Sequence, residues 1–129
     1  CDNQLDDNTY DIVYSNATIE HVGSYNNQKL FISECVRVAK KNIFITTPNR
    51  YFPLDFHTKI PFIHMLPKLI HRKILNLFGY SFFAKEENLN LLSKKDLIDH
   101  CEKLKIKNYK IISYKLYFFT SNLILVIQK

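Results

Sequence analysis

The sequence contains only two glycines, four prolines and three cysteines, and it has no tryptophan. So little glycine excludes collagen-like and glycine-rich low-complexity chains. It also leaves no Gly-x-Gly motif, the pattern that lets a backbone approach a phosphate closely. The cysteines form no Cys-x-x-Cys pair, which predicts reduced thiols in a cytoplasmic protein. No apolar run reaches the ~18 residues of a membrane-spanning helix, so none is predicted.

What is present is enough for a folded core. The 129 residues predict one domain or a large part of one, and 47% of them are hydrophobic and 14% aromatic. The net charge of +6 permits binding to nucleic acid, phosphates or an anionic membrane, and it does not select among them. No aromatic-rich RNA motif accompanies the basic residues, so we expect no nucleic-acid partner.

The apolar pattern predicts alternating strands and helices. A strand over 10–15, a helix over 26–40 and a strand over 42–47 make a βαβ unit, in which the first strand reads as a buried parallel strand. Polar residues at Thr120, Ser121 and Asn122 predict the turn of a C-terminal antiparallel hairpin. We expect this hairpin to insert next to the second strand, which gives the strand order first, second, fourth, third. The remaining predicted elements are helices over 61–78 and 94–105 and the hairpin strands 109–117 and 122–128.

The helix over 61–78 has three interpretations that the sequence leaves open. Its apolar residues recur at helical spacing, and basic residues lie on another side. It is a helix packed on the core, a lid over a hydrophobic acceptor, or an interfacial helix that makes peripheral membrane contact. Local signals are clearer, because Pro67 favours a helix start, Gly79 a helix end and Ser93 an N-cap.

The chain opens at Cys1 with a polar loop that leads directly into a strand. In a four-stranded sheet this strand would lie at an unprotected edge. We therefore expect the sequence to be part of a longer protein.

Four segments resemble the class I S-adenosylmethionine-dependent methyltransferases, specifically methyltransferase type 11-like proteins: "YDIVYSNATIEHVG", "FISECVRVAKKNIFITTPNR", "YFPLDFHTKIPFIHMLP" and "EENLNLLSKKDL". The resemblance implies an α/β fold, the C-terminal half of a Rossmann-like seven-stranded sheet with parallel strands and a C-terminal antiparallel hairpin. Residues 1–129 would form a partial methyltransferase domain that holds strands four to seven, with a loop and lid helix over about 48–80. The family's Gly-rich cofactor loop and ribose-binding acid lie upstream, so we expect the isolated chain to be inactive or very weak.

The resemblance places the cofactor S-adenosylmethionine beside Ser15, Asn16 and Ala17, which follow the first strand. The alternative is a capped turn that needs polar residues anyway. His21 is the candidate general base, because its ordinary pKa of ~6.5 suits proton transfer near neutrality. Glu20 is the second catalytic candidate, to orient His21 or accept a hydroxyl. The alternative is that both residues cap the next helix.

Three residues of the loop after the second predicted strand, Asn49, Arg50 and His57, are candidates to bind the acceptor. Arg50 suits a carboxylate or phosphate; the alternative is a solvated loop with an ordinary salt bridge. His64 and His71 are expected to serve packing or the surface. Related quinone-biosynthesis methyltransferases bind a metal near the Glu-His pair through a further carboxylate. Ala17 stands at that position, so we expect no metal.

The sequence thus predicts methyl transfer from S-adenosylmethionine to a small-molecule, lipid-precursor or sugar acceptor in the full-length protein. The alternative is a non-catalytic, methyltransferase-like module that binds a protein partner or a membrane surface. The sequence does not name the acceptor.

Overall fold

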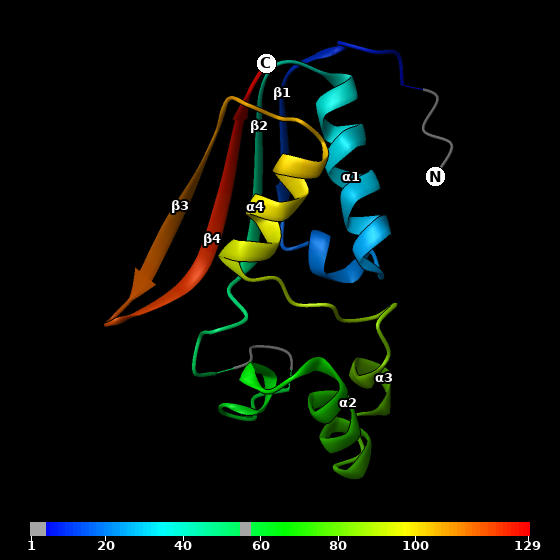
Figure 1. Ribbon diagram of the computed structural model, residues 1–129, viewed down its shortest axis with the longest axis vertical. Helices are drawn as coiled ribbons and strands as arrows, with labels where there is room; N and C mark the ends of the chain where they lie inside the picture. Colours follow the sequence, from blue (N-terminus) through cyan, green and yellow to red (C-terminus); the bar gives the residue numbers. More distant parts are fainter. Residues whose placement is uncertain (1–4, 55–57) are drawn as a thin grey trace.

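The computed structural model describes residues 5–54 and 58–129 and shows an α/β fold (Figure 1). Its four-stranded sheet has the order β1 (Tyr10–Asn16), β2 (Ala39–Pro48), β4 (Phe119–Gln128) and β3 (Tyr109–Leu116), which is the order predicted from the sequence. β1 and β2 run parallel, whereas β4 runs antiparallel to both β2 and β3. The predicted α/β class, with parallel strands followed by an antiparallel hairpin, is therefore confirmed for the described residues.

The βαβ unit consists of β1 (Tyr10–Asn16), α1 (Tyr25–Val38) and β2 (Ala39–Pro48). Helix α1 begins after Ser24, whose hydroxyl accepts the N–H of Asn27 at 3.3 Å, the usual N-cap arrangement. The helix ends two residues earlier than predicted, and β2 is correspondingly longer at both ends. A single-turn helix, η1 (Ile19–His21), lies between β1 and α1.

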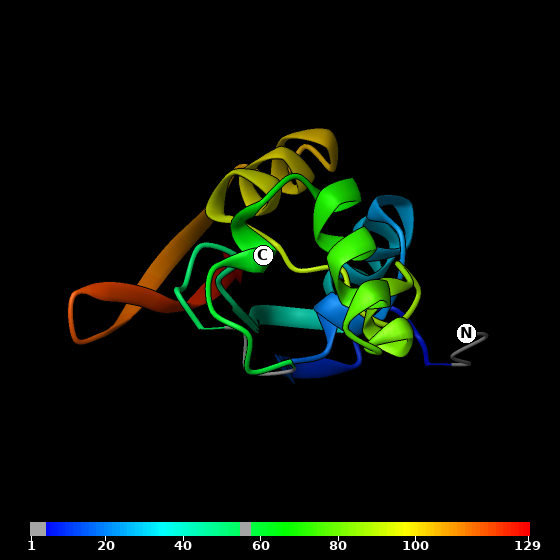
Figure 2. The same cartoon turned by 90° about the horizontal axis from the view of Figure 1, so that it is seen from below.

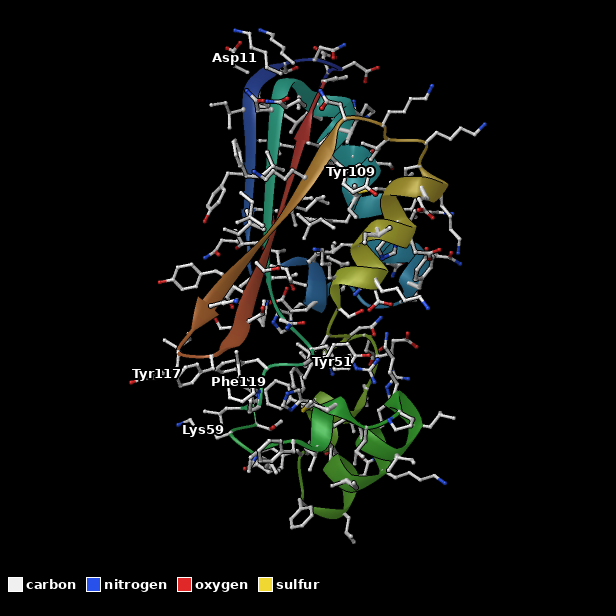
Figure 3. The ribbon with its side chains drawn as sticks, turned by 60° about the vertical axis from the view of Figure 1, so that its left-hand side comes forward. Asp11, Tyr51, Lys59, Tyr109, Tyr117 and Phe119 are labelled. Atoms are coloured by element: carbon white, nitrogen blue, oxygen red, sulfur yellow. The ribbon has the colours of Figure 1, made fainter. Side chains whose placement is uncertain are left out.

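The C-terminal hairpin consists of β3 (Tyr109–Leu116) and β4 (Phe119–Gln128). The predicted turn was wrong, because Thr120 to Asn122 belong to β4 and the chain reverses at Tyr117 and Phe118. Tyr117 adopts a left-handed backbone conformation with φ of 55°, a geometry that tight hairpin turns use and that glycine or asparagine normally supplies. Figure 3 shows Tyr117 and Phe119 at the tip of the hairpin, away from the helices.

Helices α1 and α4 (Lys94–Lys103) cover the same face of the sheet (Figure 2). Helix α4 starts with the predicted N-cap, since Ser93 and Asp96 form a reciprocal capping box. Both helices pack on the inward-facing side chains of the central strands. The core residues are Ile19, Ile32, Cys35, Ala39, Ile43, Ile45, Leu92, Leu97, Cys101, Leu123, Leu125 and Ile127. Cys35 and Cys101 are thus core residues, as expected from the sequence, and both are free thiols.

The opposite face of the sheet carries exposed apolar residues. On β1 these are Tyr10, Ile12 and Tyr14, and on β3 they are Ile112 and Tyr114. The expectation that β1 is buried on both faces was therefore wrong for the described residues, since β1 is an edge strand with one open face. The apolar run "IVY" over 12–14 has the residue types of a buried parallel strand, and residue types alone do not show which neighbouring elements cover the strand.

The segment between β2 and α4 forms the lower end of the molecule in Figure 1. It contains η2 (Ile63–Met65), α2 (Lys68–Leu77) and α3 (Ser81–Ala84). The predicted helix over 61–78 is interrupted at Pro67, after which α2 begins. Gly79, with φ of 82°, ends α2 in a Schellman motif: its N–H donates to Asn76 O and the N–H of Tyr80 donates to Leu75 O.

Candidate functional site

The carboxyl ends of β1 and β2 lie side by side, and this edge of the sheet positions most of the candidate residues. Asn16 is paired with Thr46 in the parallel register, and the N–H of Ala17 donates to the carbonyl of Thr46 at 3.0 Å. In open α/β sheets the crevice outside such strand ends is where ligands bind. The location of the site at these strand ends stays a prediction.

Asn16 and Ala17 are exposed in the turn that follows β1. The Thr46 hydroxyl donates a short hydrogen bond to the Asn16 side chain, and Ala17 adopts a left-handed conformation with φ of 49°. The Ser15 hydroxyl is buried and has no hydrogen-bond partner among the described residues. An exposed turn with an unsatisfied hydroxyl behind it fits one wall of a cofactor pocket. The alternative, a turn that only caps the end of β1, accounts equally well for the hydrogen bonds of Asn16 and Ala17 to Thr46.

Glu20 lies on the other side of the strand ends. Its side chain is completely buried, and one carboxylate oxygen accepts the Thr47 hydroxyl at 2.9 Å, whereas the other oxygen has no hydrogen-bond partner among the described residues. Because successive strand residues point to opposite faces, Thr46 and Thr47 hold Asn16 and Glu20 on opposite faces of the sheet. Only the Asn16 and Glu20 side chains are separated in this way, because Ser15 alternates with Asn16 along β1 and shares the face of Glu20.

His21 is exposed, unlike Glu20 beside it. Its Nδ1 lies 2.6 Å from the carbonyl oxygen of Asn88. A carbonyl only accepts, so we assign the proton of the neutral ring to Nδ1 and the basic lone pair to Nε2. In this tautomer the hydrogen bond from Nδ1 fixes the orientation of the ring.

Asn90 ties these elements together, and sequence reasoning missed it. It is buried, its N–H donates to the Glu20 carbonyl at 2.7 Å, and its side-chain amide donates to the Gly23 carbonyl at 2.8 Å. Its side-chain oxygen accepts the Lys68 ammonium at 2.6 Å, and Gln28 donates to its backbone carbonyl. No periodicity in the sequence marks such a residue, because its partners lie far apart along the chain.

The loop after β2 holds Asn49 and Arg50. Asn49 fixes the loop to β4, since its side chain donates to the Thr120 carbonyl at 2.9 Å. The Arg50 guanidinium donates to the carbonyls of His64 and Leu66, at 3.1 and 2.6 Å. The third predicted acceptor-binding residue, His57, lies outside the described residues.

Arg50 also lines a small polar cavity of about 10 Å³, enough for one water-sized group. Burial lowers the pKa of Lys68, which lines the same cavity. Neither Arg50 nor Lys68 has an ion-pair partner in the described part of the chain, whereas Arg72 lies 3.6 Å from Glu86. The remaining residues of the cavity wall are His64, His71, Leu89, Asn90 and Leu91.

A larger groove of about 780 Å³ runs between the open edge of β1 and helix α1. Its walls are mainly apolar, and Ile12, Val13 and Phe31 are among them. It lies along the strand edge, away from the strand ends, so its chemistry suits packing by a further protein element more than a reaction. Within residues 5–54 and 58–129 no three His, Cys, Asp or Glu side chains come together as a metal site.

A family model described as a methyltransferase domain matches residues 1–45. The resemblance to the class I methyltransferases is confirmed. This sequence match covers β1, η1, α1 and most of β2, and no curated protein matches the chain.

Three solved structures share the fold over nearly the whole chain, and two of them are described as SAM-dependent methyltransferases. A SAM-dependent methyltransferase from Archaeoglobus fulgidus has a TM-score of 0.59 and 16% identity, and the match covers 98% of this chain and 62% of that one. A SAM-dependent methyltransferase from Methanosarcina mazei has a TM-score of 0.55 and 13% identity, and the match covers 97% of this chain and 61% of that one. A protein from Bordetella parapertussis, described as possibly exported, has a TM-score of 0.61 and 10% identity, and the match covers 98% of this chain and 41% of that one.

The chain therefore spans about three fifths of the length of both archaeal methyltransferases. At these identities the structures show a shared fold. The expected cofactor agrees with the descriptions of both methyltransferases, which name S-adenosylmethionine dependence.

Proposed function

We propose that this chain is the acceptor-side part of an S-adenosylmethionine-dependent methyltransferase whose acceptor is a small molecule, a lipid precursor or a sugar. The observation that carries the proposal is the joined carboxyl ends of β1 and β2, with the exposed turn at Asn16 and Ala17, in a methyltransferase-like fold. The four strands would be the fourth to seventh of a seven-stranded sheet. The open edge of β1 and the apolar groove beside it support a sheet that continues there.

The cofactor would supply an electrophilic methyl group, and residues 15–17 would line its sulfonium end. The acceptor nucleophile has to approach in line with the sulfur–carbon bond, so positioning and exclusion of water are the main tasks of the protein. His21 would take the acceptor proton on Nε2, because its Nδ1 proton is held by Asn88. Arg50 and Lys68 would attract an anionic group of the acceptor, since both are cations without a carboxylate partner among the described residues.

Cofactor binding by the isolated chain should be weak. Only the turn after β1 contributes contacts from the described residues, and the sequence has no Gly-x-Gly loop. Calorimetric titration with S-adenosylhomocysteine at micromolar protein should show little heat. Tight binding by this chain alone would place the cofactor elsewhere.

The base assignment is tested in the full-length protein by replacing His21 with Ala. We expect turnover to fall about 10²-fold or more, with little change in cofactor affinity, and a smaller loss at high pH for an acceptor that ionises unaided. The matched control is Asn88→Ala, which keeps the backbone carbonyl that holds His21. Unchanged turnover in His21→Ala would leave positioning alone as the mechanism.

His64→Ala and His71→Ala should affect folding before they affect chemistry, because both side chains are buried, with exposed fractions of 1% and 9%. Thermal melts of the three histidine variants therefore accompany the turnover assay. An equal loss of turnover in all three, together with equal loss of stability, would contradict a specific role of His21.

The second candidate function is a non-catalytic module that binds a partner or a membrane surface. The apolar residues exposed on α2 and α3 favour it. Binding of S-adenosylhomocysteine by the full-length protein decides between the two functions. We also propose a cytoplasmic location, which the two unpaired cysteines support.

A further inference from the structure

Helix α2 presents its apolar side outward. Leu69, Ile70, Lys73 and Leu77 share one side of the helix at 3.6 residues per turn, and the leucines are 74% and 83% exposed. The opposite side is the buried one and carries His71 and Leu75. Of the three interpretations of the 61–78 segment, packing of this apolar face on the core is therefore wrong for the described residues.

The apolar side of α2 continues onto the neighbouring elements. We call the whole the α2–α3 surface, and its most prominent residues are Phe62, Leu66, Leu69, Leu77, Phe78 and Phe82, all at least 38% exposed. Single exposed apolar residues are normal, but several large ones on neighbouring elements are typical of an interaction site. Figure 1 shows α2 and α3 at one end of the molecule, beyond the sheet and away from α1 and α4.

The charge of the same segment has one sign. From Lys59 to Lys85 the sequence holds five Lys or Arg residues and no Asp or Glu. Two of the five are neutralised by the next residues along, because Arg72 pairs with Glu86 and Lys85 with Glu87. Lys59 and Lys73 are exposed and have no carboxylate partner in the part of the chain that the structure describes, whereas Lys68 is held by Asn90 on the buried side of α2.

We propose that the α2–α3 surface binds an anionic lipid bilayer, with α2 lying in the plane of the headgroups. Leucine and phenylalanine side chains would enter the boundary between headgroups and acyl chains, and the lysines would face lipid phosphates, which is the composition of interfacial helices. In the described ranges no helix is long and apolar enough to cross a bilayer, so the contact is peripheral.

A second copy of the chain fits this surface less well. A symmetric dimer would bring the same uncompensated lysines of both copies together, and like charges in a desolvated contact are unfavourable. An anionic bilayer instead attracts these lysines. The proposal does not depend on catalysis, so it stands or fails separately from methyl transfer.

The test is flotation of the protein with vesicles of phosphatidylcholine that contain about one third phosphatidylglycerol, compared with pure phosphatidylcholine vesicles. We expect binding to the anionic vesicles, much weaker binding to the neutral ones, and loss of binding at about 0.5 M salt. The double variant Leu69→Glu/Leu77→Glu should reduce partitioning at least ~10-fold. The matched control is Leu30→Glu on α1, where the leucine is 59% exposed and outside the surface, and it should bind as the parent does.

Two charge-reversal variants test the electrostatic part of membrane binding. Lys73→Glu should weaken binding to anionic vesicles about 10-fold, whereas Lys94→Glu, an equally exposed position on α4, should not. Circular dichroism melts confirm that each variant is folded. Absence of vesicle binding by the parent, or equal losses in test and control variants, would overturn the proposal. So would sedimentation of the parent as a dimer that Leu69→Glu/Leu77→Glu converts to a monomer, because a second copy would then cover the surface.

Discussion

Replacing Asn90 with Ala should destabilise the protein strongly, because this one side chain links three separate segments. The change removes the amide bond to the Gly23 carbonyl, the acceptor of the Lys68 ammonium, and a longer contact of 3.3 Å to Glu86. A neutral hydrogen bond contributes roughly 0.5–1.5 kcal/mol and one to a charged group roughly 1.5–3 kcal/mol. The expected loss in the free energy of unfolding is therefore about 3 kcal/mol, or roughly 10 °C in the melting temperature for a chain of this size.

Urea unfolding followed by circular dichroism measures this loss. The matched control is Asn108→Ala, because Asn108 is exposed and makes one side-chain contact, at 3.4 Å to Gln128. The control should change the free energy of unfolding by less than about 0.5 kcal/mol. A double-mutant cycle with Lys68→Met isolates the charged bond, for which we expect a coupling of at least about 1 kcal/mol. If Asn90→Ala costs no more than the control, Asn90 does not hold the strand-end site together.

The remaining predictions concern two kinds of buried titratable group. Burial lowers the pKa of His100, and both of its ring nitrogens lack a hydrogen-bond partner among the described residues. The unfolded chain therefore takes up this proton first, so stability should fall as the pH drops below ~6.5 and level off below the folded pKa. His100→Phe keeps an aromatic ring against Tyr25, whose ring centroid lies 4.2 Å from that of His100. The free energy of unfolding of this variant, measured with urea, should depend less on pH and exceed that of the parent by about 1 kcal/mol at pH ~5. A parallel pH dependence in parent and variant would rule out His100. Burial raises the pKa of Cys35 and of Cys101 to about 11, so in a Cys1→Ser variant a maleimide should label neither thiol until denaturant is added. Labelling of the native protein at the rate of a free thiol would show that these cysteines are accessible.

The sequence by itself determined the elements whose signals are local. The strand order follows from the βαβ pattern and the C-terminal hairpin, and the structure confirms it. The ends of two helices follow from single residues, because the Ser93 hydroxyl satisfies backbone donors of α4 and Gly79 accepts a left-handed conformation after α2. The turn of the hairpin was missed because Tyr117 takes a positive φ that its residue type does not predict.

The tertiary structure alone decided how the candidate site is divided. Glu20 and His21 are adjacent in sequence, yet one is fully buried against Thr47 and the other is exposed beside Asn88. Asn90 reaches Glu20 and Gly23 across about 70 residues of chain, so no local pattern marks it. The roles of the predicted site residues in cofactor and acceptor binding stay predictions.

Only the tertiary structure shows that the apolar face of α2 points outward. Helical periodicity shows that Leu69, Ile70 and Leu77 share one side, and it carries no information about what that side contacts. In the folded chain the core is filled by α1, α4 and the sheet, and α2 instead buries His71 and Leu75. An amphipathic pattern therefore fixes which residues act together, whereas the space left by the other elements fixes whether they face the core or the surroundings.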